Sequence, residues 1–422
     1  MIKKIRQTIK STLFQGSFLV LSANIIANFF NYLYHLITGR LLAPDQYGLL
    51  QSFIALSALL GILTYLFSYP VVNLAVKTNS KSISSLVKVL EKQSLKFSLI
   101  LWLVLIASYP LIKSFLHIDN FFLFLIFSLQ SFIYFLPIIY QSVLRAKLHF
   151  LYFSLLGIIA TLTKFIAAPF FIFIGWGLGG ALGAFIVSGL AIIFAGQYWV
   201  RKFWPGKIKE KRYKLKSSFW QFSLLSLITN FFLISLFSSD ILLVRYFLDP
   251  YLSGIYAAVS VLGKMIFFGA SSVLIVVYPL LVKFKKNPRK LMKIFGLTFF
   301  ALLFMTIIGM IVFKFSPHII VNVLYGNKYE AAVYYLPIFS LFVSLLVILN
   351  LFIQFFLALE YKTAGWLAGL AAVLQVFLII IRHENIKAII ENSIISIAVV
   401  LALSFIMIIK YFNGWYYEKK RG

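Results

Sequence analysis

Residues 176–216 read WGLGGALGAFIVSGLAIIFAGQYWV, followed by RKFWPGKIKEKRYKLK. The first 25 residues carry no charge, and at about 1.5 Å per helical residue they can cross the roughly 30 Å hydrocarbon core of a bilayer. The 16 residues that follow hold eight Lys and Arg and one acid, Glu210. Because cytoplasmic segments beside membrane spans are enriched in Lys and Arg, this stretch predicts a membrane helix that ends in the cytoplasm.

The same alternation of apolar and basic segments runs through the whole chain. Hydrophobic residues make up 62% of the sequence and charged residues only 12%, about half the share in a typical globular domain. If the N-terminus is cytoplasmic, 30 of the 39 Lys and Arg residues lie on that side, seven lie opposite and two lie within spans. This asymmetry predicts an all-α polytopic membrane protein with about twelve transmembrane helices and both termini cytoplasmic. The predicted spans are 14–37, 47–70, 95–115, 119–141, 151–173, 176–200, 219–243, 252–281, 294–315, 333–357, 362–381 and 388–410.

The long basic segment falls at the midpoint of the chain, where a connection between two halves is expected. We predict an N-terminal six-helix lobe at 1–200, a basic cytoplasmic linker at 201–218 and a C-terminal six-helix lobe at 219–422.

Short motifs indicate that the two halves are repeats. The run from Arg40 to Gly48, after the first predicted helix, resembles the run from Arg245 to Gly254, after the seventh. Six spans separate the two copies, so both run in the same direction across the membrane. That order is typical of the parallel repeats found in some transporters, although a chance match of short motifs is the alternative. Alternating access by movement of one lobe against the other follows from such a repeat.

Several chemistries are disfavoured by composition. The net charge of +28 comes mainly from cations in predicted cytoplasmic segments, where anionic lipids attract them, so we expect membrane lipids and no nucleic acid as partners. The chain has no Cys, and its five His residues do not pair at ligand spacing, so we expect no metal and no cofactor. The glycine-rich run 175–183 lacks the Lys-Ser/Thr ending of a phosphate loop and instead predicts close helix packing.

Three ionisable residues fall inside predicted spans. Lys164 and Lys264 lie near mid-membrane, and Asp240 lies toward the outer end of its span. A charged group in lipid costs about 2.5 kcal/mol or more, so these side chains are expected to face a cavity or a partner. A structural ion pair of Asp240 with Lys264 or Arg245 is one interpretation. Binding of an anionic substrate by the lysines is the other, with Asp240, Arg40 and Arg245 as coupling or structural charges.

Two polar stripes support a cavity. One lies on the first helix and one on the fourth, and each repeats at spacings close to one helical turn. Their residues are Asn24, Asn28, Asn31 and His35 on the first helix, and Gln130, Tyr134, Gln141 and Arg145 on the fourth. Hydrogen bonds between helices would also explain them. Together with the two lysines they favour a cationic cavity that takes phosphate or pyrophosphate, with all of these residues except Tyr134 as candidate substrate-binding groups.

With these residues in place, the chain resembles a known family. The resemblance rests on four motifs taken in chain order: residues 40–48, residues 177–183, residues 240–256 with Gly263-Lys264, and the run YGNKYEAA at 325–332. They are similar to the Wzx-type polysaccharide-biosynthesis flippases of the multidrug/oligosaccharidyl-lipid/polysaccharide exporter superfamily. The resemblance implies two six-helix lobes around a central cavity. It also implies transport of a polyprenyl-diphosphate-linked oligosaccharide from the cytoplasmic to the outer leaflet.

The sequence departs from two related branches. The lipid II flippases have two further helices. The drug exporters of the superfamily place an acidic residue in the first helix, where this chain has none. A cation-coupled small-molecule exporter of the same fold remains an alternative.

An enzyme that polymerises or ligates lipid-linked glycans is disfavoured. By resemblance, such enzymes use a large outer loop rich in Arg and His, whereas the outer connections predicted here are short and hold few such residues. We therefore expect no enzymatic activity.

The resemblance also implies a membrane, a source of free energy and a partner for the protein. It implies the plasma (inner) membrane of a bacterium or archaeon, coupling to Na⁺, H⁺ or the membrane potential, and a polysaccharide polymerase of the same pathway as a partner. The sugar repeat and the pathway, O-antigen or another surface glycan, stay open.

Overall fold

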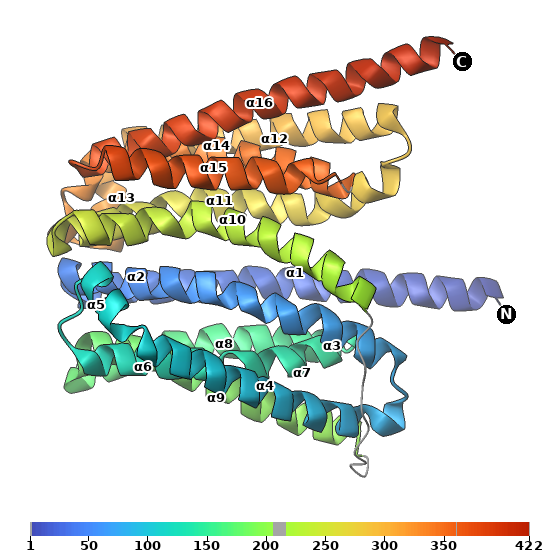
Figure 1. Cartoon of the computed structure of the whole chain (residues 1–422), viewed down its shortest axis with the longest axis horizontal. Helices are drawn as coiled ribbons and strands as arrows, with labels where there is room; N and C mark the ends of the chain where they lie inside the picture. The colour runs from blue at the N-terminus through green and yellow to red at the C-terminus, as the bar shows by residue number, and fades with distance from the viewer. Residues whose placement is uncertain (1, 206–216, 360, 422) are drawn as a thin grey trace. The chain divides into compact units, whose positions relative to one another are not determined.

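The computed structural model describes residues 2–205, 217–359 and 361–421, and this part of the chain is helical without any β-strand. The all-α membrane architecture predicted from the sequence is therefore confirmed. Figure 1 shows long helices joined by short connections. The helices are α1 (Ile2–Leu41), α2 (Pro44–Gly61), α3 (Tyr65–Lys77), α4 (Ile83–Ala107), α5 (Tyr109–Leu116), α6 (Phe121–Ile133), α7 (Phe135–Ala146), α8 (Phe150–Phe171), α9 (Gly177–Phe203), α10 (Ser217–Phe247), α11 (Pro250–Phe284), α12 (Pro288–Phe315), α13 (Pro317–Leu324), α14 (Ala332–Ala358), α15 (Thr363–Ile381) and α16 (Ile386–Arg421).

Within the described residues, nine helical segments are long and apolar enough to cross a membrane, or ten if the bent pair α4–α5 counts as one span. One of the nine, Phe150–Phe203, contains both α8 and α9 and therefore covers two predicted spans. The first predicted span, 14–37, lies on α1 but is not among the nine, and part of it falls on residues whose side chains are not described. The count of twelve stays a prediction, while the multi-pass character is shown.

The chain bends between α8 and α9 at glycines. Gly175 and Gly177 have φ angles of 94° and 49°, a region that favours residues without a Cβ atom. Just after the bend, a Cβ atom on Gly180 would lie 2.6 Å from the Cβ atom of Phe171. The glycine-rich run therefore reverses the chain and packs α9 tightly against the end of α8, as its composition predicts.

The two halves share their order of elements. α1 is followed by α2, which starts at Pro44, and α10 is followed by α11, which starts at Pro250; proline fits the first turn of a helix because no backbone donor is needed there. The third predicted span of each half lies on α4 or α12, and each of these helices is followed by an eight-residue helix, α5 or α13. The predicted span 95–115 includes most of α5 without the break before it, and α13 was not predicted because it is much shorter than a span. Their matching positions are a further sign of the repeat.

Close contacts divide the chain into two compact units, one of residues 1–42 and 60–227 and the other of residues 43–59 and 228–422. The boundaries of the two predicted lobes, 1–200 and 219–422, stay a prediction. Most of the predicted linker, 201–218, lies outside the described residues. The placement of 43–59 with the second unit has no counterpart in the sequence prediction.

In the first unit, α8 packs between α1 and α9, and α7 packs against α3, α4 and α9. In the second unit, α14 is the central helix and contacts α11, α12, α15 and α16.

The start of α2 packs into the second unit through small and aromatic residues. A Cβ atom on Gly48 would lie 2.7 Å from the backbone nitrogen of Gly254, so the two glycines of the repeated motif meet each other. Beside them, the hydroxyls of the buried Tyr47 and Tyr325 lie 2.9 Å apart, and the Tyr47 ring lies 6.0 Å from that of Tyr329. Burial, with the nearby Asp45 carboxylate, raises the pKa of Tyr329, so its hydroxyl stays neutral.

Candidate functional site

Lys164 is buried in the first unit, with 7% of its surface exposed. Its ammonium donates to the amide oxygen of Asn31 on α1 at 2.5 Å. It also lies 4.6 Å from the ring centroids of both Tyr34 on α1 and Phe185 on α9. The Tyr34 hydroxyl donates to the carbonyl of Ala181 at 3.1 Å, which fixes that ring. Three helices therefore hold the cation in one place.

The partners of Lys164 are all neutral. Within the described residues, no carboxylate lies within 4 Å of its ammonium. Each ring face contributes about 0.5–2 kcal/mol through the cation–π interaction, and the amide oxygen adds one charged hydrogen bond. An ammonium carries three donors, and one bond to Asn31 leaves capacity for more. The site is cationic and can accept an anion without displacing a carboxylate.

Lys264 lies in the second unit and has different partners. It is also buried, at 8% exposure, and donates to the backbone carbonyl of Phe237 on α10 at 2.6 Å. Asp240 interacts with it electrostatically and accepts a hydrogen bond from the Tyr256 hydroxyl at 2.8 Å. Asp240 is fully buried, and the nearby Arg245 is 5% exposed. This arrangement favours the interpretation of Asp240 and Lys264 as a structural charge pair. The two side chains interact electrostatically, while the direct hydrogen bond of the lysine goes to a backbone carbonyl.

The polar stripe on α1 divides into two parts. Asn31 and His35 are half-buried, with Asn31 on Lys164 and the His35 ring 5.4 Å from that of Tyr34. Asn24 and Asn28 lie on the exposed surface of the first unit. The structure thus brings one predicted stripe residue directly to a predicted lysine.

The second predicted stripe is interrupted, because α6 ends at Ile133 and α7 begins at Phe135. Gln130 on α6 is buried, while Gln141 on α7 is half-buried. Arg145 is exposed, donates to the Ser68 hydroxyl at 3.2 Å and lies 6.0 Å from the Phe153 ring. Arg145 therefore contacts Ser68 and Phe153 and not Lys164.

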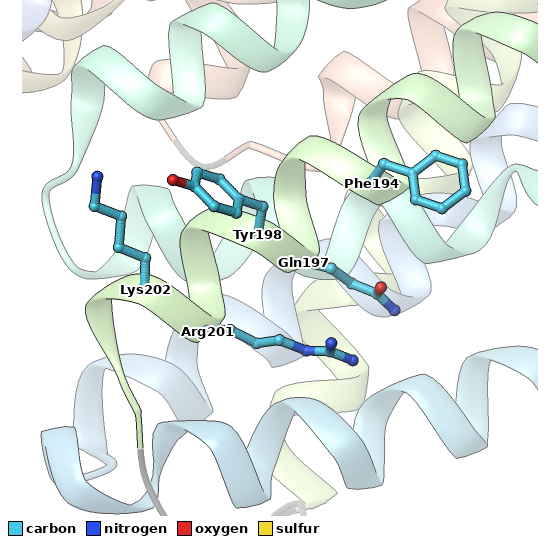
Figure 2. A pocket seen from close by; sticks show the side chains of 5 residues that line it. All are labelled: Phe194, Gln197, Tyr198, Arg201 and Lys202. Atoms are coloured by element: carbon cyan, nitrogen blue, oxygen red, sulfur yellow. The ribbon is translucent and has the colours of Figure 1, made fainter.

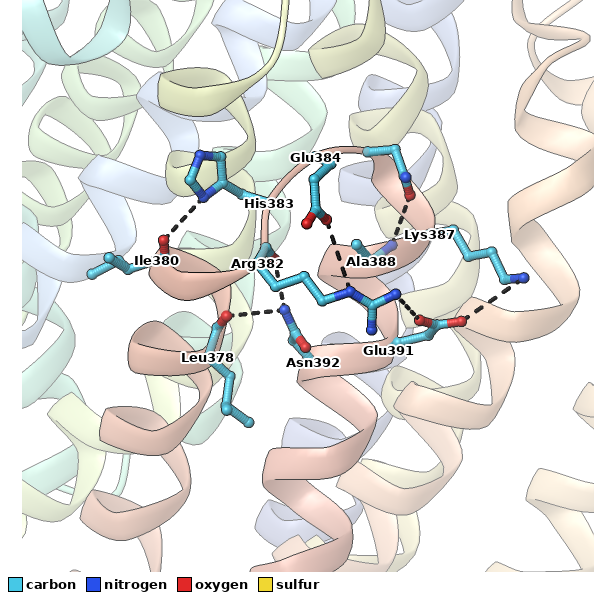
Figure 3. A network of polar contacts seen from close by, with 10 residues as sticks. Leu378, Ile380, Arg382, His383, Glu384, Lys387, Ala388, Glu391 and Asn392 are labelled. Atoms are coloured by element: carbon cyan, nitrogen blue, oxygen red, sulfur yellow. Dashed lines mark hydrogen bonds and ion pairs between the residues drawn. The ribbon is translucent and has the colours of Figure 1, made fainter.

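Arg40, the counterpart of Arg245 in the repeat, is exposed at the end of α1. The other charge cluster of the second unit lies where α15 passes into α16 (Figure 3). Arg382 pairs with Glu391 at 3.0 Å, and the Asn392 amide donates to the carbonyls of Leu378 and Arg382 at 3.0 and 2.6 Å. Such half-exposed ion pairs contribute about 0–1 kcal/mol each, and here they close a helical corner.

Sequence reasoning missed the aromatic partners of the buried charges, Tyr34, Phe185 and Tyr256. Tyr34 follows Asn31 by three residues, which places the two on neighbouring positions of one helix face. That spacing was the available signal. Phe185 and Tyr256 are on other helices from the charges they contact and left no local signal.

Comparison with known proteins adds the following. A family model described as "Polysaccharide biosynthesis protein" matches residues 13–285. No curated protein matches the chain. A multidrug resistance transporter of the MATE family, within the MOP superfamily and in an inward-facing conformation, is 15% identical with a TM-score of 0.69, covering 91% of this chain and 96% of its own.

Two further solved structures share the fold. The lipid II flippase MurJ, in an inward closed conformation, is 17% identical with a TM-score of 0.64, covering 92% of this chain and 88% of its own. A MOP superfamily transporter from Pyrococcus furiosus, described as having a binding pocket of reverse polarity, is 15% identical with a TM-score of 0.59, covering 96% of both chains. At these identities the likeness establishes the transporter fold and not the substrate.

Proposed function

The chain belongs to the polysaccharide biosynthesis protein family, and we propose that it carries a polyprenyl-diphosphate-linked oligosaccharide from the cytoplasmic to the outer leaflet. The family match, which covers well over half of the chain, and the fold shared with solved transporters support a multi-pass membrane transporter of the flippase type. The identity of the substrate, a lipid-linked oligosaccharide, is the part that we propose. Its diphosphate is the chemical group that needs a cationic site within the membrane.

The observation that supports this substrate is Lys164. A cation buried in a span is expensive, and the neutral partners Asn31, Tyr34 and Phe185 stabilise it without cancelling its charge. An ammonium acts as a compact point charge suited to a phosphate oxygen. We propose that the diphosphate of the substrate binds at Lys164 during passage, with Asn31 as a second donor through its amide nitrogen.

Transport by alternating access fits a chain built of two repeats. We propose that both termini face the cytoplasm, that the membrane is the inner membrane, and that the outer-leaflet product passes to a polymerase. Coupling to Na⁺, H⁺ or the membrane potential is the expected source of free energy.

Reconstituted liposomes provide the test. Purified protein is placed in vesicles that contain a fluorescent polyprenyl-diphosphate oligosaccharide, and a membrane-impermeant reductant reports the fraction of label on the outer face. The proposal predicts that vesicles with protein lose nearly all of the signal, whereas empty vesicles lose about half. Loss of only half the signal in both, with protein oriented and folded, would reject this substrate.

One observation favours a second candidate, a cation-coupled exporter. Asp240 is a fully buried carboxylate within a span, as a proton- or sodium-binding group would be. Its neighbours Lys264 and Tyr256 instead give it a structural partner, so the flippase is preferred. Uptake of a cationic dye into the same vesicles under a pH or sodium gradient, abolished by Asp240→Asn, would support the exporter.

A further inference from the structure

An open hollow of about 460 Å³ lies over the last three turns of α9, and Lys164 is not among the residues that line it. Five side chains line it, and Figure 2 shows them: Phe194, Gln197, Tyr198, Arg201 and Lys202. We propose that this hollow binds an anionic glycerophospholipid of the cytoplasmic leaflet, with the phosphate on Arg201 and Lys202 and an acyl chain along Phe194. The proposal goes beyond the transport function and does not depend on the transported substrate.

The position of the hollow is set by the hydropathy of α9. The 25 residues before Arg201 are uncharged, so Arg201 marks the end of the apolar span. Phe194 and Tyr198 lie one turn apart and are 68% and 61% exposed. Large apolar side chains that are exposed on a spanning helix face the acyl chains of lipids. Tyr198, the last aromatic of this face, has the amphipathic ring that is enriched at the membrane boundary.

The charges at the boundary are suited to a phosphate. Arg201 and Lys202 are both exposed, and the Lys202 ammonium lies 5.8 Å from the Tyr198 ring centroid. Among the described residues, neither cation has a carboxylate within 4 Å. The nearby carboxylate of Glu91 is bonded to the Tyr140 hydroxyl at 2.6 Å instead. The guanidinium can therefore offer its fork of donors to a phosphate, and the lysine can add a point charge.

The inner side of the hollow is held in place. Gln197 and Arg201 both interact with Tyr140 on α7, and they extend in the same direction from α9 (Figure 2). Tyr140 is itself buried, so the two polar side chains have a fixed neighbour. A basic last turn also stabilises the end of a helix by about 0.3–1 kcal/mol through the helix dipole. Stabilisation of the helix end would explain the two basic residues alone. It would not explain the hollow or the exposed aromatic face beside them, which a bound lipid does.

Native mass spectrometry of the full chain in a neutral detergent provides the test. Wild-type protein is titrated with phosphatidylglycerol or with zwitterionic phosphatidylcholine, and bound lipid is counted. We expect phosphatidylglycerol to bind more tightly. The double variant R201Q/K202Q should weaken its binding about twenty-five-fold, since each cation near an anionic lipid surface contributes about a factor of five. Lys202→Gln alone, at an exposed position, should weaken it about fivefold and is the variant to use if the double variant folds poorly.

A matched control removes the same charge elsewhere. Lys283 and Lys290 both lie beside the Phe284 ring, at 5.4 and 5.2 Å, in another predicted cytoplasmic segment. K283Q/K290Q should leave phosphatidylglycerol binding within twofold of wild type. Glycerol phosphate, which has the headgroup without the tails, should not compete. An equal loss in the control, equal binding of both lipids, or competition by glycerol phosphate would each overturn the proposal. Displacement of the phospholipid by a polyprenyl diphosphate would also overturn it, because the hollow would then be a substrate site.

Discussion

The two lysines buried in spans look equivalent in the sequence and differ in the structure. Lys164 in the first unit is held by an amide oxygen and two aromatic rings. Lys264 in the second unit is held by a backbone carbonyl and has Asp240 as an electrostatic partner. Under the proposed function, a diphosphate would meet an uncompensated cation at Lys164 and a nearly neutral pair at Lys264. The comparison therefore predicts a binding role for Lys164 and a structural role for Lys264.

The largest expected effect is on transport at Lys164. Lys164→Ala should lower glycan export at least about thirtyfold, because losing one partner of a desolvated charge contact costs about 2–5 kcal/mol. The amount of protein in the membrane should not change. Lys164→Arg should keep part of the activity, since it keeps the charge. Surface glycan and protein level are measured in cells that lack the native copy.

Lys88→Ala, at an exposed position on α4 of the same unit, is the control and should export normally. Normal export by Lys164→Ala would leave this lysine without a role in binding and would remove the contrast with Lys264.

The next effect is on stability at Lys264. Lys264→Ala removes the lysine charge beside the buried Asp240 carboxylate, which keeps its hydrogen bond from Tyr256, and removing one partner of a buried charge pair costs about 3–5 kcal/mol. The thermal unfolding midpoint of the purified protein should fall. The double variant Asp240→Asn/Lys264→Gln removes both charges and should recover most of the loss. A midpoint for Lys264→Ala equal to that of wild type would mean that Asp240 does not depend on Lys264.

A smaller effect should appear at glycines on the two lysine-bearing helices. A Cβ atom on Gly263, next to Lys264, would lie 2.2 Å from the ring of the fully buried Phe339, whereas one on Gly157 of α8 would meet nothing within 4 Å. Gly263→Ala should cost about 1–3 kcal/mol through overpacking.

Gly157→Ala should instead raise the free energy of unfolding, since alanine favours a helix by up to about 1 kcal/mol over glycine. Thermal unfolding of the two variants measures the difference. A stabilising Gly263→Ala would show that α11 is packed as loosely as α8.

The sequence predicted most of the fold and part of the site for identifiable reasons. Span positions follow from hydropathy, and Asn31 was found because a polar residue in an apolar helix is rare. Phe185 could not be found, because aromatic residues make up 18% of the chain and one more carries no signal. Likewise, no local pattern records that residues 43–59 pack with the second unit, since the contact of Gly48 with Gly254 joins positions about 200 residues apart.

The smallest effect is a pH dependence that belongs to the first unit. His149 lies between α7 and α8, and its ring stacks on that of Phe203 at 4.4 Å and 20°. Burial lowers the pKa of His149 from its ordinary value of 6.5, because the charged form is poorly solvated there. The unfolded chain therefore binds a proton at a higher pH than the folded chain does. Stability from this residue is complete above about pH 6.5 and falls as the pH drops below it. His149→Phe keeps the stacked ring and cannot titrate, so its unfolding midpoint should decrease less than that of wild type between pH 7 and pH 5. Parallel decreases in the two proteins would assign the acid sensitivity to other groups.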